Sequence, residues 1–262
     1  ELSKVCGTTG VIVSAHTSLC CWPIYKYGTE DQKMKYLPEL LSGKKLGAFG
    51  LTEPNAGTDA SGQQTRAELD GDEWVLNGAK CFITNGGYAE VFVVMAMTDK
   101  SKGNHGISAF IVEKNDPGFS IGKTEDKMGI CASSTTELIF QNCRIPKDRL
   151  LGGLGKGFKV AMQTLDGGRI GIASQALGIA EGALEVTIEY MKQRKQFGKK
   201  LAQMQALQFV VADLATKVEA AKLLVLKSAF CEDAGLPYGV PAAMAKLFAA
   251  ETAMEVTTKC VQ

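Results

Sequence analysis

The sequence contains only two histidines, His16 and His105, which lie far apart along the chain. A zinc centre needs three or four closely spaced ligands, and a Ser-His-Asp triad needs a histidine beside its nucleophile. Eight cysteines are present, but none forms a C-x-x-C pair and their spacing matches no disulfide framework. We therefore predict neither a metal centre nor such a triad, and we interpret the cysteines as reduced thiols.

The chain also lacks an excess of either charge and a long hydrophobic run. Its 29 Lys and Arg residues nearly cancel its 28 Asp and Glu residues, which argues against a nucleic-acid partner. No apolar stretch is long enough to cross a bilayer, and no signal segment opens the chain, so we expect no membrane partner. The 45% hydrophobic content over 262 residues is sufficient for a large core. The start at Glu1, without methionine, suggests a partial chain.

The chain changes character twice, which predicts three domains: residues 1–43, 44–152 and 153–262. Small and apolar residues from Leu2 to Cys21 indicate a buried helix. The sequence Thr29-x-x-Gln32 is typical of a capping box, and it predicts a helix that runs through Leu40 and stops at Gly43. Residues 1–43 are therefore expected to be helical.

The middle region contains short, β-rich runs separated by turn residues. Asn77-Gly78 is one of the turns that we expect between strands. Many short strands at this spacing favour a barrel or sandwich over the alternating strands and helices of a dinucleotide-binding sheet. The predicted strands are Leu46–Thr52, Gln64–Leu69, Trp74–Leu76, Lys80–Thr84, Val91–Met97, Ile107–Val112, Phe119–Lys123 and Thr136–Cys143.

A glycine cluster, residues 152–157, leads into a helical region. It lacks the Ser or Thr of a phosphate-binding loop and the G-x-G-x-x-G order, so we interpret it as a hinge. Apolar periodicity then predicts a long helix from Phe158 to Arg194, a second over 203–234 and a third from near Pro241. The second is apolar on nearly every face, which predicts a bundle that also packs against another subunit.

Residues 48–62 form a strand that breaks into a loop at Pro54 and Gly57. Thr52, Thr58 and Ser61 offer hydroxyl groups there, although an ordinary strand and polar turn would have the same composition. The pattern Gly50-Leu51-Thr52-Glu53-x-x-Ala56-Gly57-Thr58-Asp59-x-x-Gly62 resembles the signature of the acyl-CoA dehydrogenase family. Two further segments, Phe82-Ile83-Thr84-Asn85-Gly86-Gly87 and Leu165-Asp166-Gly167-Gly168-Arg169-Ile170, resemble that family in the same order. The resemblance extends from Glu1 to Gln262 and is greatest to the short-chain, butyryl-CoA type.

The resemblance implies an α+β fold with N-terminal helices, a central β-barrel or sandwich domain and a C-terminal helical bundle, both helical parts being incomplete. It implies FAD-dependent α,β-dehydrogenation of a short-chain acyl-CoA, with electrons passed to an electron-transfer flavoprotein. It also implies a homo-oligomer, usually a tetramer, in the bacterial cytoplasm or, in a eukaryote, the mitochondrial matrix. An acyl-CoA oxidase, an enoyl-CoA reductase of the same fold and a non-catalytic acyl-CoA or flavoprotein-binding scaffold are alternatives.

The resemblance assigns residues as well. Phe82 would pack on the flavin ring, where many members have Trp, and the Thr84 hydroxyl would donate to flavin N5. Without the resemblance, the favoured interpretation is that Phe82 is a core residue and Thr84 an edge hydroxyl. Asp166 and Arg169 would contact substrate, although their i, i+3 spacing is also that of a surface ion pair. The implied cofactor-binding residues are Phe49, Gly50, Leu51, Thr52, Glu53, Thr58, Phe82, Ile83, Thr84, Arg194, Gln196, Phe197 and Gln205. The implied substrate-binding residues are Thr58, Asp166, Gly167, Gly168 and Arg169.

No catalytic residue is assigned within the chain. In the short-chain members, the glutamate that removes the α-proton lies in a segment beyond the position of Gln262. In isovaleryl and long-chain members it stands just before the helix arginine, where this sequence has Gly168. The resemblance therefore implies a catalytic base C-terminal to Gln262.

Overall fold

A computed structural model describes all residues from 1 to 262, and their contacts form two compact units. One unit is Ile12–Leu165, and the other combines Glu1–Val11 with Asp166–Gln262. This grouping places the helices of residues 12–43 with the β region. The three-domain division of the sequence stays a prediction.

The N-terminal helices are shorter and more broken than the sequence indicated. The expected single buried helix is wrong, because α1 (Leu2–Val5) and α2 (Gly7–Ser14) bury no residue, and a π-helical segment, η1 (Ala15–Cys21), follows them. Next come α3 (Trp22–Tyr27) and α4 (Glu30–Leu41). The capping box is confirmed: the Gln32 amide N–H donates to the Thr29 hydroxyl at 3.2 Å, and the Thr29 N–H donates to the Gln32 side chain at 3.1 Å.

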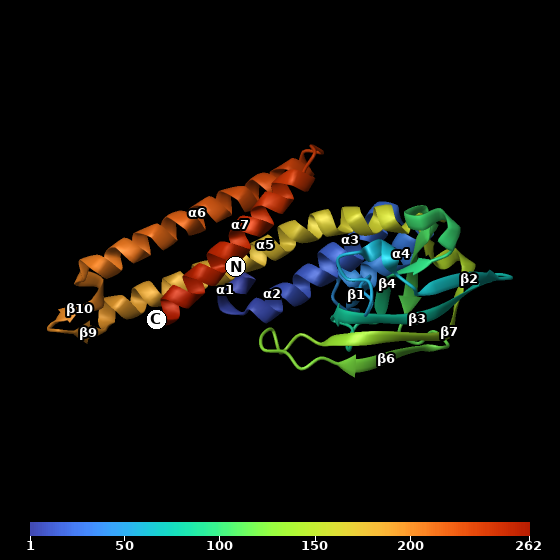
Figure 1. The fold of residues 1–262 in the computed structure, drawn as a ribbon, viewed down its shortest axis with the longest axis horizontal. Coiled ribbons are helices and arrows are strands. Elements are labelled where there is room, and N and C mark those ends of the chain that lie inside the picture. Colours follow the sequence, from blue (N-terminus) through green and yellow to red (C-terminus); the bar gives the residue numbers. More distant parts are fainter. The chain divides into compact units, whose positions relative to one another are not determined.

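Eight strands form one mainly antiparallel sheet, shown to the right of Figure 1. The expected Asn77-Gly78 turn is wrong, because β3 runs through it with a register shift. Gly78 has a φ of +144°, and a Cβ there would lie 2.6 Å from the Thr65 hydroxyl, so only glycine allows this crossing. The strands are β1 (Gly47–Gly50), β2 (Arg66–Asp70), β3 (Glu73–Thr84), β4 (Val91–Met97), β5 (Ile107–Glu113), β6 (Phe119–Thr124), β7 (Thr135–Pro146) and β8 (Leu150–Leu151).

The sheet has a hydrophobic core on each face. Along β4, Val93 packs with η1, α3 and α4, whereas its neighbours Phe92 and Val94 pack with β3 and β7. Successive side chains of a strand point to opposite faces, so a strand buried on both sides must be apolar throughout. This requirement explains the unbroken apolar run of β4. The helices η1, α3 and α4 cover the face of the sheet to which Val93 points.

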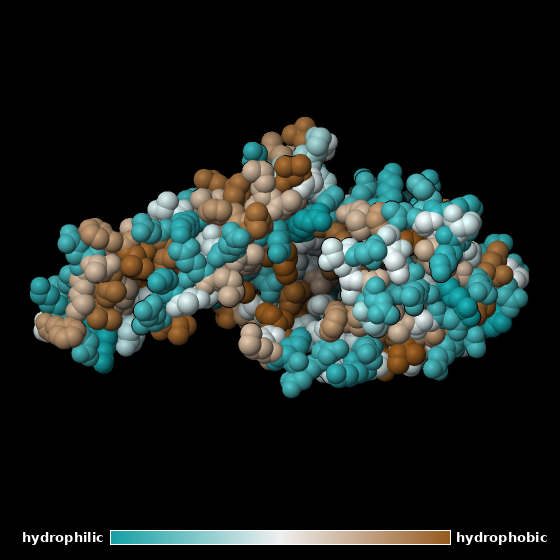
Figure 2. Space-filling model, viewed as in Figure 1, coloured by the Kyte–Doolittle hydropathy of each residue, from teal (hydrophilic) through white to brown (hydrophobic).

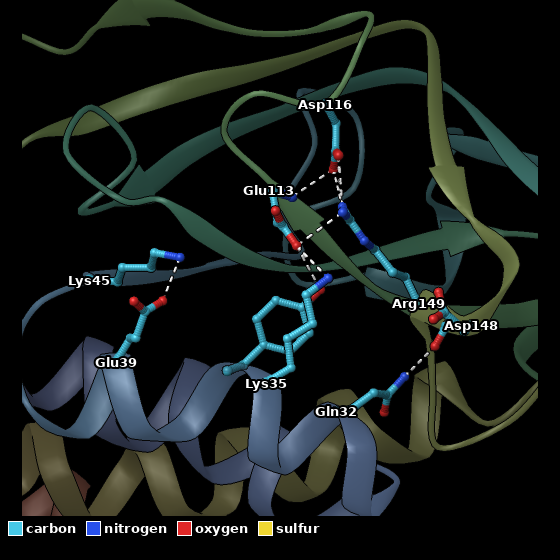
Figure 3. A network of polar contacts seen from close by, with 9 residues as sticks. Gln32, Lys35, Glu39, Lys45, Glu113, Asp116, Asp148 and Arg149 are labelled. Carbon is cyan, nitrogen blue, oxygen red and sulfur yellow. Dashed lines mark hydrogen bonds and ion pairs between the residues drawn. The ribbon is translucent and has the colours of Figure 1, made fainter.

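A buried polar network joins α4 to the sheet (Figure 3). The Arg149 guanidinium donates to both carboxylate oxygens of Asp116, at 2.7 and 2.6 Å, and lies 3.0 Å from Glu113. The Tyr36 hydroxyl donates to the same Glu113 carboxylate at 2.8 Å, and Lys35 lies 3.1 Å from it. Burial raises the pKa of Asp116, although Arg149 opposes this shift. Arg149 is thus the central cation of a buried cluster.

Replacing Arg149 by methionine is expected to lower the free energy of unfolding by about 3–5 kcal/mol, because the change leaves Asp116 buried without its partner. Denaturation monitored by circular dichroism gives the value. The matched control is Arg144→Met, which removes ion pairs of a more exposed arginine with Asp70 and Glu73 and is expected to cost about 0–1 kcal/mol. Equal losses in the two variants would contradict the assignment.

The other unit is helical. It contains most of α5 (Gly157–Gln193), a small hairpin of β9 (Lys195–Gln196) and β10 (Lys199–Lys200), α6 (Gln205–Asp233) and α7 (Gly239–Val261). The three predicted long helices are confirmed. Figure 1 shows α6 beside α7, and buried residues such as Val225 and Ala249 pack in their common core. The glycine hinge forms a turn with positive φ at Gly152, Gly153 and Gly155, after which α5 begins.

Within the chain, helix α6 is buried along one face only, so its expected packing against another subunit stays a prediction. Leu214, Val218 and Val225 are buried, whereas Leu223 and Phe230 are exposed. Figure 2 shows apolar side chains on the outer surface of this helical unit. The apolar composition of α6 therefore exceeds what packing within the chain requires. No helix of the chain combines the length and apolar character needed to cross a membrane.

Candidate functional site

A cavity of about 170 Å³ lies within the unit Ile12–Leu165. Its walls come from four places in the sequence: the π-helical segment η1, the end of β1 with the two residues after it, the end of β3, and α5. The chain thereby brings together most of the residues that the sequence assigned to a flavin ring. The lining residues are Ala15, Leu19, Phe49, Leu51, Thr52, Phe82, Ile83, Thr84 and Leu165.

The end of β3 turns Phe82 toward the cavity. The β3–β7 register shifts between Lys80 and Ile83, and Phe82 has a φ of +58°, which non-glycine residues rarely adopt. As a result Ile83 is buried, whereas the Phe82 ring is 63% exposed. Phe82 is therefore not a core residue. A positive φ in an aromatic residue at a cavity wall is the kind of backbone strain that accumulates at functional sites.

The end of β1 forms the second wall. The Cys81 N–H donates to the Thr52 carbonyl at 2.9 Å, which holds this segment against β3. Phe49, Leu51 and Thr52 line the cavity, whereas Gly50 is buried and does not line it. A Cβ at Gly50 would lie 3.3 Å from Leu138, so this glycine serves close packing.

Glu53 points away from the cavity into a buried ion pair with Lys80. Its carboxylate lies 2.6 Å from the Lys80 ammonium and accepts the Gln64 N–H at 2.6 Å and the Thr65 N–H at 3.0 Å. Its backbone N–H and carbonyl both bond to Ala56. All polar groups of Glu53 are thus engaged within the chain, so its contribution to a cofactor site is indirect.

The Glu53–Lys80 pair is deeply buried, and Lys80 has no exposed side-chain surface. Burial lowers the pKa of Lys80 to about 8, against the opposing effect of Glu53. Burial alone would raise the pKa of Glu53, but the Lys80 charge and the Gln64 N–H outweigh it and leave that pKa lowered. The lowered pKa of Glu53 favours its ionised carboxylate, whereas burial acts against the charged form of Lys80 and the Glu53 charge opposes that effect.

The remaining assigned residues lie outside the cavity. Thr58 is exposed in the loop after β1. Arg194, Gln196 and Phe197 belong to the β9–β10 hairpin of the helical unit, and Gln205 begins α6. Phe197 is 93% exposed with a φ of +52°, which leaves the ring without packing partners in its own chain.

Asp166 and Arg169 form the ion pair that their spacing allowed. Both are partly exposed on α5, in the same helical unit, and the helix continues without interruption through Gly167 and Gly168. Asp166 faces the beginning of α7, since a Cβ at Gly239 would lie 3.6 Å from its carboxylate. Gly167 faces the end of α6, since a Cβ at Gly167 would lie 3.6 Å from the Glu232 carboxylate.

Sequence reasoning missed four residues of this region. Ala15, Leu19 and Leu165 line the cavity, and Lys80 supports it from behind. The i, i+4 spacing of Ala15 and Leu19 indicates a shared helix face but not what that face contacts. Lys80 could have been recognised from the sequence because it is a lysine between apolar residues of a strand.

Comparisons with known proteins identify the family of the chain. Three family models match in order: the acyl-CoA dehydrogenase N-terminal domain over residues 1–44, the middle domain over 48–143 and the C-terminal domain over 155–262. A short-chain specific acyl-CoA dehydrogenase of Clostridium acetobutylicum is 62% identical over the whole chain, which spans 69% of that protein. The chain belongs to the acyl-CoA dehydrogenase family.

Two solved structures are similar throughout this acyl-CoA dehydrogenase chain. Butyryl-CoA dehydrogenase from Megasphaera elsdenii is 57% identical with a TM-score of 0.99; 100% of this chain and 69% of that one are covered. A structure described for the electron transferring flavoprotein of Acidaminococcus fermentans is 61% identical with a TM-score of 0.99 and the same coverage. The predicted fold class is confirmed, and the family is one of FAD-dependent oxidoreductases.

The donor set of the cavity suits a flavin. Phe82 offers an exposed aromatic face, and Thr52 and Thr84 offer hydroxyls that form no hydrogen bond within the chain. A flat ring with a polar edge is bound by one apolar surface and a few directed donors. The residues present therefore fit the isoalloxazine part of FAD.

Proposed function

We propose that this protein binds FAD and catalyses α,β-dehydrogenation of a short-chain, butyryl-CoA-like thioester to the trans-2-enoyl-CoA. One observation carries the proposal: Thr52, Phe82 and Thr84 line one cavity together with the apolar residues Ala15 and Leu19. Polar donors suit a flavin edge, and apolar lining suits the ring and an acyl chain.

The cavity residues divide into two roles. Phe82 would pack against the flavin ring, and Thr52 and Thr84 would donate hydrogen bonds to its polar edge, the Thr84 hydroxyl to N5. FAD, when bound, supplies the acceptor for the substrate β-hydrogen as hydride. Glu53 would act only through Lys80 and the loop that follows β1.

A short acyl chain is favoured by the relatives that the chain resembles. A short-chain specific acyl-CoA dehydrogenase is 62% identical over the whole chain, and in this chain Leu19 contributes an apolar side chain to the cavity lining. In an apolar pocket, one methylene changes discrimination by roughly 10- to 200-fold. The similar solved protein from Megasphaera elsdenii is a butyryl-CoA dehydrogenase, which supports the same choice.

Further assignments rest on family membership. We propose that Thr58, Asp166, Gly167, Gly168 and Arg169 contact the acyl-CoA, and that no residue of 1–262 is the catalytic base. Residues of the β9–β10 hairpin with Gln205 would contact FAD of a neighbouring subunit in a homotetramer. The electron acceptor would be an electron-transfer flavoprotein, in keeping with the similar structure described for one. The proposed compartment is the bacterial cytoplasm or the mitochondrial matrix.

Anaerobic titration of the intact, FAD-loaded protein with butyryl-CoA tests the function. Bleaching of the flavin absorption with formation of crotonyl-CoA is expected. Reoxidation by electron-transfer flavoprotein and not by oxygen would support a dehydrogenase, whereas rapid reoxidation by oxygen would indicate an oxidase. Reduction of crotonyl-CoA at the expense of NADH would favour the reductase, and binding without bleaching would favour the scaffold.

Replacing Thr84 by alanine is expected to slow flavin reduction about tenfold or more, because the lost hydroxyl would act where charge develops during hydride transfer. FAD retention is expected to change less, since one hydrogen bond contributes about 1 kcal/mol to binding. Stopped-flow bleaching and equilibrium dialysis measure the two quantities. Thr84→Ser, which keeps the hydroxyl, is the control; an unchanged bleaching rate in Thr84→Ala would refute the role.

A further inference from the structure

Lys80 lies behind the cavity wall, two residues before Phe82 on β3. Its ammonium donates to three oxygens: the Leu51 carbonyl at 3.1 Å, the Glu53 carboxylate at 2.6 Å and the Gln63 side chain at 3.1 Å. An ammonium has three N–H donors, so each of them has one acceptor here. Two of the acceptors, on Leu51 and Glu53, belong to the segment that directly follows β1.

A backbone hydrogen bond next to this contact also joins β3 to the residues that follow β1. The Cys81 N–H donates to the Thr52 carbonyl at 2.9 Å, one residue along from each partner of the Lys80–Leu51 bond. Gly50 lies over the Lys80 stem, because a Cβ at Gly50 would be 3.5 Å from Lys80 Cγ. The Lys80 side chain thus passes directly under the β1 segment that carries the cavity residues.

The Glu53 carboxylate extends this link into the following loop. It accepts N–H groups of Gln64 and Thr65, and the Gln63 side chain donates to the Ala60 carbonyl at 2.8 Å. The loop from Pro54 to Gln64, which carries Thr58, is therefore closed at its base by one buried cluster. The side chains of Glu53, Lys80 and Gln63 leave no buried polar atom without a hydrogen-bond partner.

Stability alone does not explain a charged pair at this depth. Replacing a buried ion pair by well-packed apolar residues is often neutral or stabilising, because charges lose their hydration on burial. An apolar side chain at position 80 could fill the same space. It would not fix the direction of the Leu51 carbonyl or of the Glu53 carboxylate, which directed hydrogen bonds do.

We propose that Lys80 is a positioning residue for the flavin site. Its bonds to Leu51 and Glu53 hold the end of β1 at a fixed place relative to Phe82 and Thr84, so that the two walls of the cavity present one surface to the flavin. The proposal rests on the proposed FAD-binding function.

The test compares Lys80→Met with Arg149→Met in the intact, FAD-loaded protein. Both variants remove the cation of a buried ion pair in the same unit, and both are expected to lower the thermal unfolding midpoint. Only Lys80→Met is expected to change the visible circular dichroism of the bound flavin and to raise the FAD dissociation constant by about tenfold. The Arg149 variant keeps the wild-type values of both.

A double variant, Lys80→Met with Glu53→Gln, covers the case in which Lys80→Met does not fold. It leaves no unpaired charge, and it is expected to recover stability while keeping the altered flavin spectrum. Wild-type flavin dichroism and FAD affinity in either folded Lys80 variant would overturn the positioning role. A wild-type protein that binds no FAD would instead overturn the proposed function.

Discussion

Replacing Leu19 by tryptophan is expected to reduce the rate of flavin bleaching by butyryl-CoA at least about 100-fold, while FAD stays bound. Leu19 lies on η1 and forms the apolar wall of the cavity together with Ala15. An indole there would occupy the space that the acyl chain needs, and misplacement of a substrate by about 1 Å already costs roughly 100-fold. Stopped-flow absorption under anaerobic conditions measures the rate.

The opposite substitution, Leu19→Ala, enlarges the same wall and is expected to move the preference from butyryl-CoA toward hexanoyl-CoA by about tenfold or more. Leu41→Trp, at an exposed position of α4 in the same unit, is the matched control and should leave both rates unchanged. If Leu19→Trp bleaches at the wild-type rate, the acyl chain does not bind against η1.

Much of the strand pattern was predictable because short β-rich runs and the turn residues between them are local features. Val91–Met97 was predicted with the bounds that β4 has in the structure, and the β5 prediction, Ile107–Val112, is one residue shorter than the strand. The failure at Asn77-Gly78 has a tertiary cause. Such a pair normally favours a hairpin turn, but Gly78 instead lets β3 pass close to Thr65, a contact that no local pattern reveals.

The cavity was predictable only in part. Family-like motifs indicated the ends of β1 and β3, and the structure brings Thr52, Phe82 and Thr84 together as those motifs imply. The positive φ of Phe82 and the contribution of η1 depend on long-range packing, which no local sequence pattern indicates. Glu53 belongs to the same motif, yet its partner Lys80 lies 27 residues away in the sequence. A sequence motif therefore indicates where a site lies. It does not show which of its residues line the cavity and which only hold those residues in place.

Two side chains at the exposed β9–β10 hairpin have few contacts within the chain. Phe197 is almost fully exposed in a strained conformation, and Arg194 forms no ion pair in the chain. Strain of this kind costs on the order of 1–3 kcal/mol and persists where surrounding contacts compensate it. The Phe197 side chain has almost no such contacts within the chain, which supports the proposal that the hairpin is completed by a neighbouring subunit and that subunit's FAD.

Arg194→Ala is accordingly expected to lose FAD and the tetramer together. A guanidinium can pair bidentately with a pyrophosphate, and removing one partner of such a desolvated charge pair costs about 2–5 kcal/mol, or roughly 30- to several-thousand-fold in affinity. Light scattering gives the molar mass, and the flavin-to-protein absorbance ratio gives the FAD content.

Arg194→Lys and Lys195→Ala separate geometry from charge. Lysine at position 194 keeps the charge but not the planar pair of donors, so an intermediate loss of FAD is expected. Lys195→Ala removes an adjacent exposed charge and is expected to leave FAD content and mass near the wild-type values. Wild-type mass and FAD content in Arg194→Ala would show that Arg194 binds no cofactor across a subunit interface, and an equal loss in Lys195→Ala would show that only the general positive charge of the hairpin matters.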